Sequence, residues 1–202
     1  KDPTYINNHP CMTLMHDEQR LKELERRLGI SVKRIEQKAI IHCSGNSRDL
    51  FEYNGVLSCK AASLLSLGHR TCAYSCLGFG DCVQVCPYEA IRIDEEKKVA
   101  VVDRDKCIGC GLCVNECPKG LIEIVPAEAF VFLACSYEAR KNIPGRERCD
   151  NGCIHCRKCY KVCPSNAITW DEKKDLPIID HTMCTGCYKC VEVCPSHCMV
   201  KL

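Results

Sequence analysis

The stretch that decides the fold is Cys107-Ile-Gly-Cys110-Gly-Leu-Cys113-Val-Asn-Glu-Cys117-Pro118. Three thiols at intervals of two residues, then a fourth thiol followed by proline, is the spacing that bacterial-type ferredoxins use for [4Fe-4S] clusters. The two glycines in this loop allow the backbone to curl closely around an inorganic core. Because Pro118 cannot continue the helix before it, the chain turns there, and we expect Cys117 to reach a neighbouring cluster.

The same pattern recurs because the chain contains a tandem repeat. A shift of 77 positions carries eight cysteines of one half onto eight of the other, and carries Pro118 onto Pro195. The superposed pairs are Cys72 and Cys149, Cys76 and Cys153, Cys82 and Cys159, Cys86 and Cys163, Cys107 and Cys184, Cys110 and Cys187, Cys113 and Cys190, and Cys117 and Cys194. Such a repeat indicates duplication of one module that holds two clusters.

The ligands follow from the crossed arrangement of two-cluster ferredoxins, in which the fourth cysteine of each loop ligates the other cluster. This rule predicts one cluster held by Cys72, Cys76, Cys82 and Cys117. It predicts a second held by Cys107, Cys110, Cys113 and Cys86, and another held by Cys184, Cys187, Cys190 and Cys163.

The last cluster has two possible ligand sets, because four thiols compete for three places beside Cys194. The internal repeat selects Cys149, Cys153 and Cys159, since Cys156 corresponds to Phe79. The spacing of two residues between thiols selects Cys153, Cys156 and Cys159, and we prefer this set because that loop geometry is the commoner one. In total, the sequence predicts four [4Fe-4S] clusters.

The composition agrees with a metal protein in a reducing compartment. The chain has 22 cysteines in 202 residues, grouped in short loops, and it does not open on a charged region followed by an apolar one. These features favour a metal-binding protein over a secreted protein held together by disulfides. Structural zinc sites use two separated pairs of ligands, commonly with histidine, so iron–sulfur is favoured over zinc.

Charge and motif content limit the remaining functions. The formal charge of +2 would become negative once thiolates and clusters are counted, so nucleic-acid binding has no support. The longest apolar run, 127–135, is interrupted by Glu128 and is shorter than the ~18 residues that span a bilayer. No dinucleotide fingerprint, phosphate loop or catalytic triad stands out. We therefore expect one-electron transfer without a substrate site of the chain's own.

The expected fold class is α+β, with two tandem bacterial-type 2[4Fe-4S] ferredoxin folds preceded by a small α/β N-terminal segment. The proposed divisions are 1–70 for that segment, 71–126 and 149–202 for the two modules, and 127–148 for an insert between them. Periodicity predicts helices at 17–28 and 58–67, and a helical turn or two between the third and fourth cysteines of each motif. It predicts strands at 39–43, 90–93, 99–102, 121–125, 167–170, 176–179 and 199–202.

Five cysteines lie outside the predicted ligand sets. Cys43 and Cys59 stand alone in apolar segments, where a thiol usually acts as a small buried side chain. The same structural role is preferred for Cys135 and Cys198. The fifth, Cys11, precedes the first predicted helix.

Several of these motifs resemble a known family. The runs Cys43-Ser-Gly-Asn, Tyr53-Asn-Gly-Val-Leu-Ser-Cys59-Lys-Ala-Ala, Cys72-Ala-Tyr-Ser-Cys76-Leu-Gly-Phe-Gly-Asp-Cys82 and Cys149-Asp-Asn-Gly-Cys153-Ile-His-Cys156 are similar to the B subunit of the Rnf complex. That complex is a membrane-bound ferredoxin:NAD oxidoreductase that couples electron flow to ion pumping. The loop from Cys72 to Cys82 is the specific part of the resemblance, since generic ferredoxins use shorter spacing.

The resemblance implies an electron-carrying subunit that is peripheral on the cytoplasmic face of the cell membrane. It would pass electrons between soluble ferredoxin and the iron–sulfur and flavin subunits of the complex. In that family a membrane anchor and a small iron–sulfur domain come first, and Cys11 matches the last ligand of that domain's cluster. Membrane contact is therefore expected only through partners or through such an anchor ahead of Lys1. The alternatives are a free-standing polyferredoxin, a subunit of another flavin-based oxidoreductase, or an iron–sulfur structural or redox-sensing protein.

Overall fold

The computed structural model describes residues 18–29, 36–139, 141 and 143–202. The helices are short apart from α2 (Glu18–Leu28), and they comprise α3 (Cys59–Leu64), α4 (Asp81–Gln84), α5 (Leu112–Glu116), α6 (Lys158–Val162) and α7 (Lys189–Glu192). The strands are β1 (Gln37–Ile41), β2 (Ile91–Asp94), β3 (Val99–Val102), β4 (Ile122–Pro126), β5 (Val131–Leu133), β6 (Ile168–Asp171), β7 (Leu176–Ile179) and β8 (Met199–Lys201). The structure is thus a mixture of small helices and strands.

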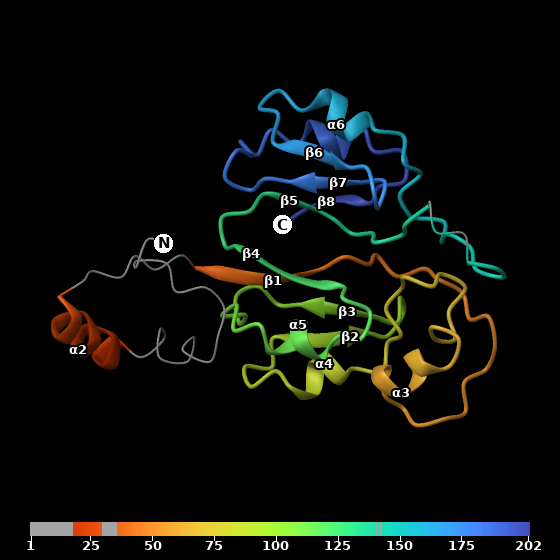
Figure 1. The fold of residues 1–202 in the computed structure, drawn as a ribbon, viewed down its shortest axis with the longest axis horizontal. Coiled ribbons are helices and arrows are strands. Elements are labelled where there is room, and N and C mark those ends of the chain that lie inside the picture. Colours follow the sequence, from red (N-terminus) through yellow and green to blue (C-terminus); the bar gives the residue numbers. More distant parts are fainter. Residues whose placement is uncertain (1–17, 30–35, 140, 142) are drawn as a thin grey trace.

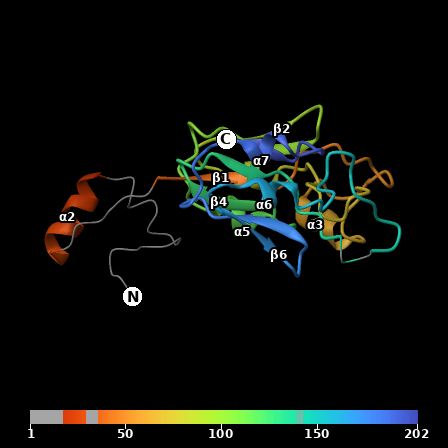
Figure 2. The ribbon, with the colours of Figure 1, turned by 90° about the horizontal axis from the view of Figure 1, so that it is seen from above.

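The strands of the described residues form four two-stranded antiparallel sheets. Neighbouring strands make the hairpins β2–β3 and β6–β7, whereas β1 pairs with β4 and β5 pairs with β8 across long stretches of chain. In Figure 1 the sheets follow one another from β6–β7 at the top, through β5–β8 and β1–β4, to β2–β3 below. Figure 2 shows α2 at one end of the molecule, away from the sheets, and α3 on the opposite side.

The two halves contain the same aspartate-stabilised hairpin turn. The Asp94 carboxylate accepts hydrogen bonds from the N–H groups of residues 96 and 97, and Asp171 does the same for residues 173 and 174. An aspartate that bonds its own backbone in this way fixes a tight turn between two strands. The duplicated sequence therefore builds the same hairpin twice.

The helical turns expected inside the cysteine motifs are present as α4, α5, α6 and α7. Each begins after a residue with a left-handed backbone. Gly80 and Gly111 take this place in the first half, whereas Arg157 and Tyr188, both at φ 58°, take it in the second. Glycine adopts this conformation without the steric cost that Arg157 and Tyr188 carry.

Some expected boundaries differ from the observed ones. The strand expected at 39–43 begins and ends two residues earlier, because its register with β4 starts at the pair Gln37 and Pro126. The helix expected at 58–67 ends at Leu64, because Ser66, Leu67 and Gly68 all have positive φ and turn the chain. Leu28, the last residue of α2, is 59% exposed.

The segment between the halves contains a strand that periodicity did not predict. β5 lies within the expected insert 127–148 and pairs with β8, with Leu133 opposite Met199. Its three residues are too few for a clear alternating pattern. As β1 joins β4 in the same way, each of these sheets combines a strand of a proposed module with a strand from outside it.

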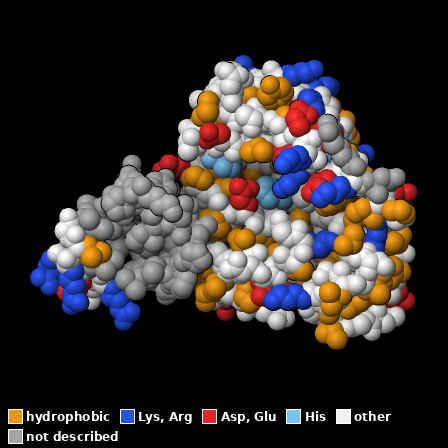
Figure 3. All heavy atoms as spheres, in the orientation of Figure 1, with side chains coloured by type: hydrophobic (Ala, Val, Ile, Leu, Met, Phe, Trp, Pro, Cys, Tyr) orange, Lys and Arg blue, Asp and Glu red, His pale blue; other side chains and the backbone are white. Residues whose placement is uncertain are grey.

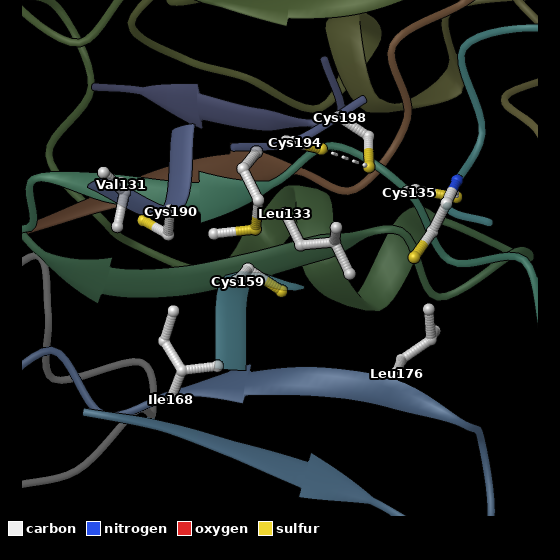
Figure 4. Packing of buried hydrophobic residues seen from close by; sticks show 11 residues of the cluster. Val131, Leu133, Cys135, Cys159, Ile168, Leu176, Cys190, Cys194 and Cys198 are labelled. Atoms are coloured by element: carbon white, nitrogen blue, oxygen red, sulfur yellow. Dashed lines mark hydrogen bonds between the residues drawn. The ribbon is translucent and has the colours of Figure 1, made fainter. Parts of the chain in front are cut away.

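The two largest hydrophobic clusters both contain cysteines, and in the cluster around Ala39 and Leu121 they are three of the ten buried residues. Six of the eleven buried residues of the cluster around Val131, Ile168 and Met199 are cysteines. Figure 4 shows Cys159 and Cys190 pointing into this cluster, with Cys135 at one end of it. A core built from thiols offers little apolar area, so bound metal is expected to supply much of the folding free energy.

The two halves contact one another between the inner sheets. Ile40, Val125 and Ala129 form a small buried cluster that packs with Phe132 and Leu202. Beside it, the ring nitrogens of His42 lie 2.6 Å from the carbonyl oxygen of Leu133 and 2.7 Å from the Glu123 carboxylate. Figure 3 shows histidine and acidic side chains gathered in the hollow between the upper and lower lobes. The repeat units are therefore packed on each other.

In the part of the chain that the structure describes, no helix has the length and hydrophobicity needed to cross a membrane.

Candidate metal centres

The loop that begins at Cys107 forms one thiol-lined pocket. Cys86, Cys107, Cys110 and Cys113 line it together with apolar side chains such as those of Ile91 and Ile124. The N–H groups of Ala39 and Gly109 donate to the Cys107 sulfur over 3.3 and 3.4 Å, and the N–H of Ala90 donates to Cys86 over 3.3 Å. Such hydrogen bonds stabilise thiolate charge and tune the potential of a bound cluster.

Close backbone contact explains the glycine at position 109. Gly109 has a φ of +71°, and a Cβ there would lie 2.5 Å from the carbonyl oxygen of Gln37 in β1. Its repeat partner Gly186 has a φ of +68°, and a Cβ there would lie 2.7 Å from the Phe130 ring. The loop of Gly109 therefore packs closely against β1, and the loop of Gly186 packs closely against Phe130, the residue before β5.

The pocket of the first loop contains a thiol that was not predicted as a ligand. Cys76, Cys82 and Cys117 line it, as expected, and the fourth thiol is Cys59. Cys72 is not one of the described residues that line this pocket. Burial raises the pKa of the Cys72 thiol to about 11, and the neighbouring Cys149 and Cys43 thiols act in the same direction.

Asp81 holds Cys59 in place. Its carboxylate accepts hydrogen bonds from the N–H of Cys59 at 2.8 Å, the N–H of Lys60 at 3.1 Å and the hydroxyl of Ser58 at 2.8 Å. Burial raises the pKa of this carboxyl, but the hydrogen bonds from Cys59, Lys60 and Ser58 outweigh it and leave the pKa lowered. Since Asp81 is the first residue of α4, it joins the start of α3 to the ligand loop.

In the second half, the pocket geometry agrees with the loop spacing. Cys153, Cys156, Cys159 and Cys194 line one pocket with Trp170 and Met199, and Cys149 is not among the described residues that line it. Cys198 also borders this pocket, is 2% exposed, and has its sulfur 3.5 Å from that of Cys194. A hydrogen bond from Cys198 lowers the pKa of Cys194 to about 5.

The remaining quartet lies on the other side of the same core. Cys163 and Cys184 pack against the buried cluster that contains Cys190. Burial raises the pKa of Cys190 to about 11, and the thiols of Cys184 and Cys187 act in the same direction. Among the described cysteines, Cys187 and Cys156 are the exposed ones. The second half therefore has two thiol sets that reach the surface.

The donor sets fit iron–sulfur clusters. Each set offers four thiols, and backbone N–H groups point at several of the sulfurs. Burial raises the pKa of Cys82, Cys113 and Cys159 to about 12, so these thiols keep their protons until metal replaces them. Within the described ranges, no group of three or more His, Cys, Asp or Glu side chains is arranged to hold a single metal ion.

The sequence analysis did not place Cys59 in a ligand set, although the repeat contained a signal for a further thiol. The first half has Phe79 where the second half has Cys156, so its loop lacks one thiol of the usual three. Phe79 packs beside Cys59, Ala62 and Leu77. A missing ligand in one copy of a repeat indicates that a cysteine from elsewhere can take its place.

Comparison with known proteins agrees with this chemistry. The family model described as a 4Fe-4S dicluster domain matches residues 69–121 and 152–198. The chain is 35% identical over 169 residues to the B subunit of the ion-translocating oxidoreductase complex of Methanosarcina acetivorans, covering 81% of this chain and 62% of that protein. It is equally similar to the B subunit of the proton-translocating ferredoxin:NAD(+) oxidoreductase complex of Clostridium ljungdahlii, 35% identical over 81% of this chain and 57% of that protein.

A third relative is the B subunit of the Na(+)-translocating ferredoxin:NAD(+) oxidoreductase complex of Acetobacterium woodii. It is 37% identical over 71% of this chain and 51% of its own length. These matches confirm the resemblance drawn from the motifs, and the chain spans between half and two thirds of the relatives it matches.

Proposed function

We propose that this chain, a homologue of the B subunits of ion-translocating ferredoxin:NAD oxidoreductase complexes, carries electrons within such a complex. The observation that carries the proposal is the set of four-thiol groups, three of which line pockets. Each [4Fe-4S] cluster, when bound, accepts and releases one electron. The chain's own part is to bind, insulate and connect these centres.

The proposed ligand sets follow the geometry. They are Cys86, Cys107, Cys110 and Cys113; Cys59, Cys76, Cys82 and Cys117; Cys153, Cys156, Cys159 and Cys194; and Cys163, Cys184, Cys187 and Cys190. The pocket lining favours Cys59 over Cys72 in the first half and Cys156 over Cys149 in the second. Both halves keep the crossed arrangement, because Cys117 and Cys194 each join the loop of the neighbouring motif. Two tandem ferredoxin folds are the architecture that this arrangement supports.

The surface of the second half is the proposed place of electron exchange with partners. Cys156 and Cys187 are exposed, and Ile154 and Tyr160 in the same stretch of chain as Cys156 are 45% and 46% exposed. An exposed ligand with exposed apolar side chains nearby in the chain allows a partner to approach closely. We propose soluble ferredoxin and the iron–sulfur and flavin subunits of the complex as the partners, at the cytoplasmic face of the membrane.

A redox titration with an iron count tests the proposal. We expect at least about sixteen irons per reconstituted chain, and reduction at the low potentials that ferredoxin or NADH can reach. An iron content near eight, or clusters that stay oxidised at those potentials, would contradict it; the second result would favour a structural role. Co-migration with membrane subunits on native gels separates a complex subunit from a free-standing polyferredoxin.

A further inference from the structure

Two cysteines that looked isolated in the sequence occupy matching places in the two halves. Cys43 follows the end of β1 by two residues, and Cys135 follows the end of β5 by two residues. The Cys43 sulfur accepts a hydrogen bond from the N–H of Cys76 at 3.4 Å, and the Cys135 sulfur accepts one from the N–H of Cys153 at 3.2 Å. Since Cys76 and Cys153 are repeat partners, the two isolated thiols are equivalent by structure although they do not superpose in sequence.

Cys72 and Cys149 are also equivalent, and both lie outside the pockets described above. Contacts between the halves bring their segments together. The N–H of Glu147 donates a hydrogen bond to the carbonyl oxygen of Thr71 at 3.1 Å. Thr71 directly precedes Cys72, and Glu147 lies two residues before Cys149. On the Cys135 side, the hydroxyl of Ser136 donates to the carbonyl oxygen of Tyr74 at 3.1 Å.

Two of the four thiols are buried, and Cys43 and Cys149 are partly exposed. Cys72 and Cys135 are 5% and 7% exposed. Burial raises the pKa of Cys43, Cys72 and Cys135, and in each case the charge of the Cys149 thiol contributes in the same direction. The hydrogen bonds described above place the segment of Cys149 beside that of Cys72, and the segment of Cys135 beside Tyr74.

A cationic side chain acts on each of three of these thiols. Arg70 acts on Cys43, Lys119 on Cys72 and Arg148 on Cys149, in each case lowering the pKa of the thiol. Four thiolates around an oxidised [4Fe-4S] core carry a net charge of about −2, which nearby cations stabilise. The surroundings thus suit the charge of a cluster.

We infer that Cys43, Cys72, Cys135 and Cys149 bind a fifth [4Fe-4S] cluster at the junction of the two halves. The assignment extends the function proposed above, because this centre would join the two pairs of clusters. Cys76 and Cys153, ligands of the neighbouring sets, donate their N–H groups to its sulfurs. With this quartet assigned, Cys198 is the one described cysteine outside a four-thiol set.

The iron content of the full chain tests the inference without any substitution. After anaerobic reconstitution we expect about twenty irons per chain, against about sixteen if only the other four sets bind clusters. A redox-active protein with about sixteen irons overturns the fifth cluster and leaves the proposed function intact. An iron content near eight overturns both.

A double variant locates the extra cluster. Cys72→Ser with Cys149→Ser is expected to lose about four irons and one spectroscopic component, while the remaining clusters stay reducible. Leu64→Ser, at a side chain that is 89% exposed, serves as the control and keeps the iron content of the unsubstituted chain. Equal iron in the double variant and the control overturns the inference. So does zinc found by elemental analysis at one ion per chain, or a disulfide found by mass spectrometry in the freshly purified protein.

Discussion

Asp81 shows how one side chain positions a thiol that lies far from the cysteine motif in sequence. It belongs to α4, beside Cys82, yet its carboxylate accepts three hydrogen bonds from the start of α3. A carboxylate that accepts bonds from the first N–H groups of a helix satisfies donors that have no partner inside the helix. Through this contact, Cys59 is held at the pocket that also contains Cys76 and Cys117.

Replacing Asp81 by asparagine should therefore weaken the binding of one cluster. The amide has only one acceptor oxygen for three donors, and losing such bonds at a buried helix end costs on the order of 1–3 kcal/mol. For Asp81→Asn we expect lower iron content and faster loss of the first-half cluster, measured by cluster absorbance during chelation. Asp94→Asn, at an exposed hairpin turn, is the matched control. Equal rates of loss in both variants would argue against the role given to Asp81.

Substitutions at Gly109 and Gly111 distinguish the backbone cost of a side chain at positive φ from the cost of a steric clash. Gly109 and Gly111 both have positive φ, but only Gly109 has an atom within 4 Å of a Cβ built on it. For Gly111→Ala we expect the backbone cost alone, about 1 kcal/mol. Gly109→Ala adds a clash with the Gln37 carbonyl and should cost on the order of 1–3 kcal/mol more. Both costs are measured by unfolding in denaturant, monitored through the absorbance of the clusters. Equal unfolding midpoints for the two variants would exclude close contact between residue 109 and β1.

At the scale of elements, the two halves begin the same helices with different residues. The first half uses glycine, whereas the second uses Arg157 and Tyr188 in the same strained conformation. Both side chains make cation–π contacts, and the Lys201 ammonium lies 4.4 Å from the centre of the Tyr188 ring. The guanidinium of Arg157 lies 4.8 Å from the centre of the Trp170 ring and 3.0 Å from the Glu172 carboxylate. These contacts connect the start of α6 to the hairpin of β6 and β7.

Two variants of Arg157 distinguish the strain from the contacts. Alanine removes the contacts and keeps the strain, while glycine removes both. We expect Arg157→Gly to be more stable than Arg157→Ala by about 1 kcal/mol, with the original chain at least as stable as either. Thermal unfolding of the reconstituted proteins measures the order. If the alanine variant equals or exceeds the glycine variant, the left-handed conformation at residue 157 carries no cost.

At the scale of the whole molecule, the core depends on its thiols. The cluster around Val131 and Met199 is largely cysteine, and the sheets have only two strands each. Two-stranded sheets are marginal by themselves, and small cores rarely suffice without metal or disulfides. We therefore expect the clusters to support the fold as well as the proposed electron transfer.

Removal of iron should unfold both halves of the protein. After anaerobic chelation we expect loss of the strand signal in circular dichroism and of any cooperative thermal transition, because binding energy at such sites is folding energy. Refolding should follow when iron and sulfide return. An apo chain that keeps a cooperative transition would show that side-chain packing alone holds the structure, and the clusters would then be dispensable for folding.

The sequence by itself determined the chemistry and most of the local structure. Thiol spacing, the proline after the fourth thiol and the 77-residue repeat act over a few residues, so they predict the ligand loops, their helical turns and the hairpins. Only the tertiary structure decided which distant thiols meet. In the proposed sets, Cys59 is placed by the contact of Asp81 with α3, and Cys43 and Cys135 are placed by the pairing of β1 with β4 and of β5 with β8. Such pairings depend on packing between segments far apart in the chain, and no local pattern encodes them.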